Sequence, residues 1–134
     1  INVASLAGRF AVPGAAVYTS TKHAVVALSE ALHYELSPLG VRVTVVNPGT
    51  VATPGFPHRD MAERGSRMLL QPERIADVIV RVVRSGKAPE VSVPRSLAAL
   101  QLVRLVAPPF YRFALQRAVK RGMRATNVRE DRTG

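Results

Sequence analysis

The chain has 134 residues, no cysteine and a formal net charge of +10. This length allows one domain at most, and the lack of cysteine excludes a disulfide framework and a thiolate metal site. Hydrophobic residues make up 47% of the chain, which is typical of a globular rather than a disordered protein. The sequence begins at Ile1, without a leader and inside an apolar stretch, so we expect it to be a piece of a longer protein or of a truncated gene product.

The positive charge is concentrated at the C-terminal end. Residues 95–134 carry nine Arg or Lys against two acidic residues, whereas residues 1–94 carry ten against seven. A basic patch suits anionic partners such as lipid head groups or nucleic acid. A solvated, arginine-rich surface would have the same composition, and both interpretations stay open.

The first elements in chain order are a strand, a helix and a second strand. Residues 1–4 are typical of the end of a buried strand, and a loop with a turn at Pro13-Gly14 follows. Residues 15–37 predict a helix that Gly40 ends. Residues 41–46 are β-branched, as in a parallel strand covered on both faces, and residues 47–49 should turn the chain at its carboxyl end. The helix prediction rests on the apolar spacing of Ala24, Leu28, Ala31, Leu32 and Leu36.

A long loop, a helix and a third strand come next. Residues 50–70 have no clean period, and loops of this length are usually functional. Pro72 suits the first turn of a helix that should end near Gly86, and residues 90–94 predict a short strand. The order strand, helix, strand, helix, strand predicts an α/β fold with a parallel sheet. The expected buried face of the second helix is Ile75, Ala76, Val78, Ile79, Val82 and Val83.

Residues 95–134, the C-terminal tail, predict a basic and partly amphipathic helical extension. Residues 96–107 are almost wholly apolar, Pro108-Pro109 interrupt them, and residues 110–124 show a helix with a cationic stripe. Neither piece reaches the roughly 20 apolar residues that span a bilayer. The tail could lie in a membrane interface, or it could pack on its own domain or on a partner subunit. We expect residues from Thr126 onward to be disordered.

Tyr18 and Lys22 stand four residues apart, a spacing that puts both side chains on one face of a helix. An ammonium beside a phenol favours the phenolate, which suits a group that gives and takes a proton. Surface helices also carry such pairs by chance, so the neighbouring signals decide. Ser5 follows the first strand and residues 47–53 follow the second, and ligands bind at the carboxyl ends of parallel strands.

In this order and at these separations, the three signals resemble the classical short-chain dehydrogenase/reductase family. Residues 2–8 are similar to the segment with the family's catalytic serine, thirteen residues before the tyrosine; residues 18–22 match the Tyr-x-x-x-Lys signature, and residues 48–53 match the Pro-Gly segment. The resemblance covers residues 1–94 and implies the C-terminal half of a Rossmann-like, doubly wound sheet. The glycine-rich phosphate loop has no match, so the cofactor-cradling half is expected to precede Ile1.

The resemblance implies an NAD(P)-dependent oxidoreductase that interconverts an alcohol and a ketone or aldehyde. Tyr18 would exchange the proton with the substrate oxygen, Lys22 would bond the nicotinamide ribose, and Ser5 would polarise the same oxygen. The implied catalytic residues are therefore Ser5, Tyr18 and Lys22, with no metal site. The implied contacts to NAD or NADP come from Tyr18, Lys22, Pro48, Gly49, Val51 and Thr53.

The hydrophobic residues of the long loop favour a small, lipophilic alcohol or carbonyl substrate, although a loop packed on the core would contain the same residue types. They are Phe56, Met61, Met68, Leu69 and Leu70. The resemblance also implies a cytoplasmic homo-oligomer when the protein is full length. We expect no nucleic-acid partner, because the basic residues cluster without interleaved aromatic residues or a known motif. The competing hypothesis is a non-enzymatic fragment, or a peripheral membrane or partner-binding module, that uses residues 95–124 for contact with a membrane surface or partner.

Overall fold

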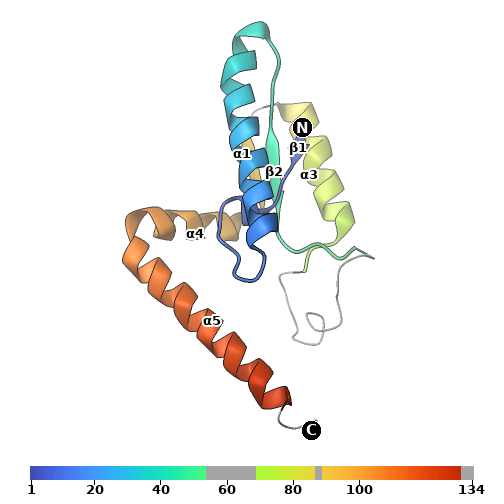
Figure 1. Ribbon diagram of the computed structural model, residues 1–134. Helices are drawn as coiled ribbons and strands as arrows, with labels where there is room; N and C mark the ends of the chain where they lie inside the picture. The colour runs from blue at the N-terminus through green and yellow to red at the C-terminus, as the bar shows by residue number, and fades with distance from the viewer. Residues whose placement is uncertain (54–68, 87–88, 131–134) are drawn as a thin grey trace. The chain divides into compact units, whose positions relative to one another are not determined.

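A computed structural model describes residues 1–53, 69–86 and 89–130, including side chains except those of residues 97–100 and 121–130. The chain divides into two compact units, Ile1–Ala98 and Ala99–Gly134, and each is described by itself. Figure 1 shows the course of the chain through its helices and strands. Phe56, Met61 and Met68, which the sequence assigns to a substrate loop, lie outside the described residues.

The first unit is built on a three-stranded parallel sheet with the order β1-β2-β3. These strands are β1 (Asn2–Val3), β2 (Val45–Pro48) and β3 (Glu90–Val93). Asn2 is level with Val45, and Val45 is level with Glu90. The predicted α/β fold with a parallel sheet is confirmed.

The central strand begins later than the sequence indicates. β2 starts at Val45 rather than at residue 41, and it includes Asn47 and Pro48, which were expected in a turn. The neighbours set these bounds, because the four residues of β3 are level with Val45–Pro48 and the pairing starts there. Before the strand, the Val43 carbonyl lies 2.9 Å from His33 Nδ1 on the first helix.

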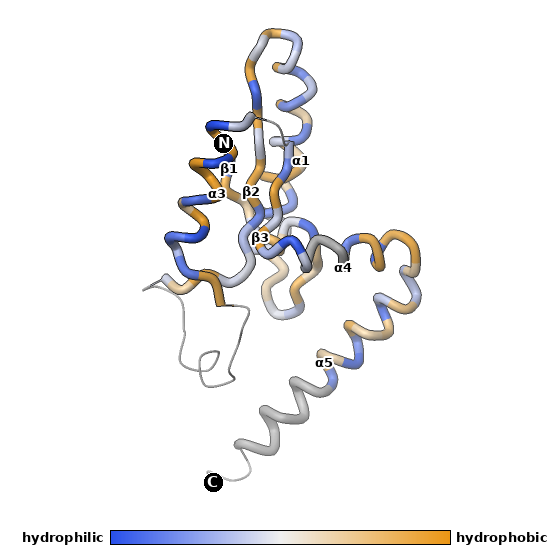
Figure 2. The backbone as a smooth tube through the Cα atoms, turned by 180° about the vertical axis from the view of Figure 1, so that it is seen from behind, coloured by the Kyte–Doolittle hydropathy of each residue, from blue (hydrophilic) through white to orange (hydrophobic). Residues whose placement is uncertain are grey.

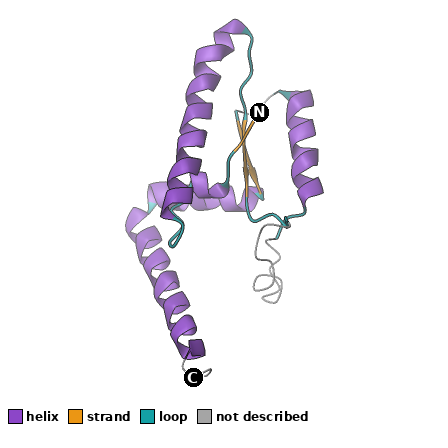
Figure 3. Ribbon diagram, turned by 45° about the vertical axis from the view of Figure 1, so that its right-hand side comes forward, coloured by secondary structure: helices purple, strands orange, loops and turns teal. Residues whose placement is uncertain are grey.

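Two helices cover the two faces of the sheet. Helix α1 (Ala16–Leu36) lies on one face and α3 (Pro72–Ser85) on the other, with the strands between them in Figure 3. One apolar cluster joins Ala4, Val26 and Val45, and the other joins Leu70, Ile75 and Val93. This double covering explains why β2 begins with two buried valines, Val45 and Val46.

The two helices bury narrower stripes than their sequences suggest. The apolar positions that predict α1 do not mark its buried face, since Leu28 is 56% exposed while Val26 and Ser29 are buried. Ser29 accepts a hydrogen bond from Asn2 Nδ2 at 3.0 Å, so this side of the sheet is partly polar. On α3, the expected burial of Ala76 and Val83 is wrong, because a three-stranded sheet covers mainly one line of residues along the helix.

Local signals set the ends of these helices as predicted. Gly40 (φ +75°) follows a short 3₁₀ turn, η2 (Ser37–Leu39), after α1, and Gly86 (φ +58°) ends α3. Both glycines adopt a left-handed conformation that other residues rarely take. Pro72 is the first residue of α3, where its missing N–H costs no helical hydrogen bond.

A polar network crosses the α1 side of the sheet. The Arg9 guanidinium pairs with the Glu90 carboxylate through two nitrogens: Nε donates to Oε1 at 2.9 Å, and Nη2 donates to Oε2. Asn47, which is fully buried in β2, donates from Nδ2 to the same Oε1 at 2.7 Å. Glu30 on α1 lies 3.9 Å from Arg9 Nη2. The segment after β1 is thereby tied to β3 across the central strand.

The second unit holds most of α4 (Arg95–Val106) and all of α5 (Pro108–Glu130). Helical bonds continue through the junction, because Ala107 N donates to Val103 O and Tyr111 N donates to Ala107 O. The prediction of disorder from Thr126 is wrong for residues 126–130, which no glycine or proline interrupts and which continue α5. In the part of the chain that the structure describes, no helix is long and apolar enough to cross a membrane.

Replacement of Asn47 tests the network. Asn47→Asp would place a buried carboxylate beside the partly exposed carboxylate of Glu90, so we expect the free energy of unfolding to fall by about 3 kcal/mol or more at neutral pH. Asn47→Leu is the matched control of similar size, and its loss should be about 1 kcal/mol. Urea denaturation measures both variants, and equal losses would contradict a charge-sensitive network.

Candidate active site

Ser5 stands at the point where the chain leaves β1. Its side-chain oxygen accepts a hydrogen bond from Ala7 N at 3.1 Å and so caps a 3₁₀ helix, η1 (Leu6–Gly8). The cap uses a lone pair of the hydroxyl and leaves its hydrogen able to donate to another group. The serine is half-buried, and its position is fixed by the turn that it caps.

Tyr18 and Lys22 lie side by side in the first turns of α1. Lys22 Nζ is 5.7 Å from the centroid of the Tyr18 ring, as expected for two residues one helical turn apart. Tyr18 is 49% exposed, so its phenol is within reach of solvent or a ligand. The structure thus places the phenol and the ammonium together on one accessible part of the helix.

Gly8 brings the serine segment against this helix. A Cβ atom at Gly8 would lie 2.7 Å from the Lys22 carbonyl oxygen and 2.7 Å from Val26 Cγ2. Only a residue without a side chain allows η1 to approach α1 this closely. Sequence reasoning left Gly8 as a loop residue without a role, although its place between Ser5 and Tyr18 was the available signal.

The segment after β2 reaches the same part of the structure. Gly49 N donates to Val93 O at 2.7 Å, and a Cβ atom at Gly49 would lie 3.4 Å from Leu6 Cδ1 of η1. The serine turn is therefore adjacent to both α1 and the Pro-Gly segment. The structure brings these three predicted segments together at the carboxyl ends of β1 and β2.

The backbone N–H and C=O groups of Val51 point away from Leu70, the residue with which Val51 forms a β-bridge. It forms a parallel bridge with Leu70, in which Leu70 N donates to Thr50 O at 2.8 Å and Ala52 N donates to Leu70 O at 2.9 Å. These bonds use the groups of the residues flanking Val51, so its own N–H and C=O point to the opposite side. A donor and an acceptor on one residue suit a ligand amide. Thr53 lies two residues farther on and is exposed.

The histidines of α1 have structural partners. His23 Nδ1 lies 2.9 Å from Thr19 O, and His33 Nδ1 lies 2.9 Å from Val43 O. Each ring therefore contacts a backbone carbonyl through one nitrogen. The candidate site offers the hydroxyl groups of Ser5 and Tyr18 and the Lys22 ammonium. Such donors can stabilise negative charge that develops on an oxygen atom.

The close approach at Gly8 can be tested by adding one carbon atom. We expect Gly8→Ala to lower the free energy of unfolding by about 1 to 3 kcal/mol, because the methyl group meets backbone as well as a side chain. Gly14→Asn is the control: Gly14 has φ +83° with open space around it, and asparagine tolerates that conformation. Chemical denaturation should show little change for the control, and a neutral Gly8→Ala would argue against the tight contact.

Comparisons with known proteins show which proteins this chain is similar to. The family model for short chain dehydrogenases matches residues 1–63. An uncharacterized oxidoreductase of Staphylococcus epidermidis is 40% identical over 80 residues, which are 60% of this chain and 34% of the relative. A cyclopentanol dehydrogenase of Comamonas is 39% identical over 72 residues, 54% of this chain and 29% of the relative. The chain thus spans about a third of the length of these relatives.

The structure is also similar to that of a solved reductase. A 3-oxoacyl-[acyl-carrier protein] reductase from Brucella melitensis, solved with bound NAD, superposes with a TM-score of 0.57 and 31% sequence identity. The match covers 69% of this chain and 37% of the reductase. The similarity therefore extends beyond the residues that carry the sequence motifs.

Proposed function

We propose, from the premise that residues 1–63 belong to the short-chain dehydrogenase family, that this chain carries the proton-transfer part of an NAD(P)-dependent oxidoreductase. The reaction would interconvert an alcohol and a ketone or aldehyde. The observation that carries the proposal is the convergence of η1, the start of α1 and the Pro-Gly segment, for which the contacts of Gly8 and Gly49 are the direct support.

Tyr18 is the proposed acid/base. Its phenol would give a proton to the substrate oxygen during reduction and take it back during oxidation. The Lys22 ammonium lies 5.7 Å from the centroid of the ring, one helical turn away on the same side of α1. The same ammonium would donate to the nicotinamide ribose and so help to orient the bound cofactor.

Ser5 is the proposed second hydroxyl at the substrate oxygen. Its lone pair already accepts from Ala7 N, so its O–H is oriented away from that contact and can donate to the substrate. Two hydroxyl donors that meet at one oxygen stabilise the charge that appears there as hydride is transferred. In this proposal, the turn that Ser5 caps serves to hold the hydroxyl in place.

The residues after β2 fit one end of the cofactor. When bound, the nicotinamide supplies or accepts the hydride. The outward N–H and C=O of Val51 match the donor and acceptor of a carboxamide, and the Thr53 hydroxyl could add a third contact. Pro48 and Gly49 would set the path of this segment against η1. We propose NAD or NADP as the cofactor, supported by the NAD bound in the related Brucella reductase.

We also propose a small-molecule substrate and a homo-oligomeric assembly for the intact protein. A small alcohol or carbonyl compound fits the name of the Comamonas relative, a cyclopentanol dehydrogenase. Homo-oligomer formation by the intact protein is supported by the apolar surface of α1, where Val17 is 80%, Leu28 56% and Tyr34 68% exposed. The cytoplasmic location stays a prediction.

Replacement of Tyr18 gives the direct test. Tyr18→Phe removes only the hydroxyl, and we expect turnover to fall by about 100-fold or more, because general acid–base catalysis contributes that much. Tyr34→Phe makes the same chemical change at an exposed position of the same helix and should leave turnover unchanged. The assay follows the absorbance of the nicotinamide cofactor during turnover. The protein used for it includes any segment that is encoded upstream of Ile1. Full activity of Tyr18→Phe would contradict the proposed function.

A pair of substitutions separates the two roles of Ser5. Ser5→Ala removes both the cap and the proposed donor, so stability should fall by about 1 kcal/mol and turnover should fall far more than that loss explains. Ser5→Thr keeps a hydroxyl and should retain the cap and part of the activity. Thermal unfolding and initial rates measure the two effects. Normal turnover in folded Ser5→Ala would remove Ser5 from the catalytic set.

A further inference from the structure

The second unit exposes an unusual amount of apolar surface where α4 meets α5. The exposed fractions are 63% for Leu102, 77% for Leu105, 75% for Val106, 65% for Phe110 and 58% for Phe113. We call these five residues the apolar ridge. Figure 2 shows hydrophobic residues gathered at this junction and hydrophilic ones interspersed along α5. Contiguous exposed surface of this kind marks an interaction site in many proteins.

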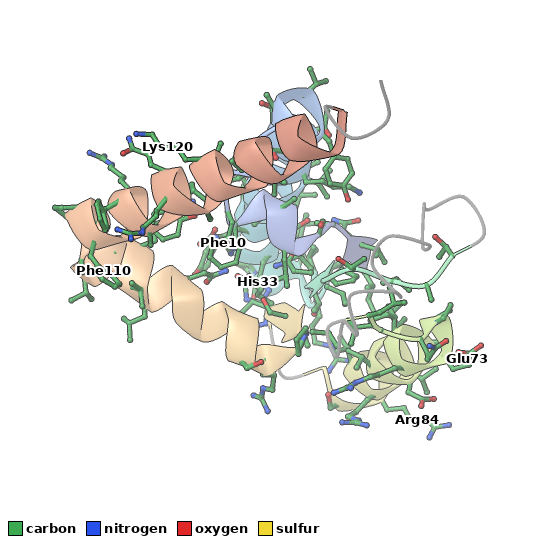
Figure 4. All side chains as sticks on the ribbon, turned by 90° about the horizontal axis from the view of Figure 1, so that it is seen from below. Phe10, His33, Glu73, Arg84, Phe110 and Lys120 are labelled. Carbon is green, nitrogen blue, oxygen red and sulfur yellow. The ribbon has the colours of Figure 1, made fainter. Side chains whose placement is uncertain are left out.

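Positive charge accompanies the ridge along α5. From Arg95 to Arg129 the sequence contains cationic residues and not one Asp or Glu. Arg112, Arg117 and Lys120 are exposed, and Figure 4 shows Phe110 and Lys120 on the same helix. A surface that combines large apolar side chains with only positive charge is complementary to an anionic surface that also offers an apolar interior.

The apolar and cationic side chains share one side of α5. Phe110, Phe113 and Arg117 follow one another at intervals of three and four residues, which places them on adjacent turns of one face. The Arg117 guanidinium carbon lies 5.9 Å from the centroid of the Phe113 ring. The face therefore begins apolar at Phe110 and becomes cationic toward Lys120, with an aromatic–cation contact between the two parts.

We propose that the apolar ridge, with Arg117 and Lys120, docks the chain on an anionic lipid surface. The ridge side chains would enter the boundary between head groups and acyl chains, while the cations would pair with phosphate and carboxylate groups above it. Long cationic side chains suit this arrangement, because their stems lie in apolar surroundings and their charges reach the polar layer.

The charge and the side-chain types of this surface favour an anionic bilayer over a second copy of the chain or a nucleic acid. A second copy of the same face would bring like charges together, which disfavours pairing through this surface. Nucleic acid would match the positive charge, but it offers little to the aliphatic Leu102, Leu105 and Val106, which cannot stack on bases as aromatic residues do. An anionic bilayer uses both the aliphatic and the cationic side chains. This inference is independent of the proposed catalytic chemistry.

Co-sedimentation of the 134-residue chain with vesicles tests the proposal. The probes are phosphatidylcholine vesicles alone and vesicles in which about a third of the lipid is phosphatidylserine. We expect binding to the anionic vesicles, little binding to the neutral ones, and a decline as salt is raised. Arg117→Gln with Lys120→Gln should weaken the binding by about 30-fold, and Phe110→Ala with Phe113→Ala by at least about tenfold.

Matched controls come from the first unit. Arg84→Gln with Arg81→Gln removes two exposed charges of α3, and Leu39→Ala removes an apolar side chain that is 74% exposed. Neither change should affect vesicle binding, and circular dichroism should show that every variant is folded. Equal binding to both kinds of vesicle, or normal binding by both tail variants, would overturn the proposal.

Three further results would also overturn it. A dimer that forms without lipid and dissociates in Phe110→Ala with Phe113→Ala would identify a second copy as the occupant of the ridge. A loss of thermal stability in that variant, with vesicle binding unchanged, would show that the ridge packs within the chain. Tighter binding to a short DNA duplex than to anionic vesicles would favour nucleic acid.

Discussion

The arrangement of the candidate site depends on the contact between η1 and α1 at Gly8. The absence of a side chain at this residue lets the serine turn lie directly on the backbone of Lys22 and on Val26. Lys22 is itself part of the proposed proton-transfer pair, so the Gly8 contact lies next to that pair. On its other side the same turn meets Gly49 through Leu6. A 3₁₀ turn of three residues thus lies between Lys22 and Gly49, which are 27 residues apart in the sequence.

The two faces of the sheet are stabilised in different ways. The α3 side is an apolar cluster around Ile75 and Val93, which depends on burial and tolerates small shifts. The α1 side combines a small apolar cluster with directional contacts, among them Asn2 to Ser29 and the pairing of Arg9 with Glu90. Because hydrogen bonds specify geometry more narrowly than apolar contacts do, the face that carries the candidate site is the more precisely positioned one.

Much of the first unit could be predicted from local sequence, because its helix ends depend on single residues. Gly40, Pro72 and Gly86 set those ends through their own backbone preferences, and a periodic sequence predicts each helix. The buried faces could not be predicted in the same way. They depend on which partner covers them, and Leu28 and Val83 are apolar residues for which this unit supplies no cover. The start of β2 was missed for a related reason, since pairing with β3 decides it.

The site residues show the same division between local and tertiary information. The spacing of Tyr18 and Lys22 is a property of one helix, so sequence alone could place them together. The approach of Ser5 to that helix depends on Gly8, and the outward backbone of Val51 depends on its bridge to Leu70. Neither contact has a signature in its own segment. A motif therefore identifies the groups that could do the chemistry, while glycine contacts and strand pairing determine whether those groups meet. For this chain, the backbone contacts of Gly8 and Gly49 are what turn three separate motifs into one candidate site.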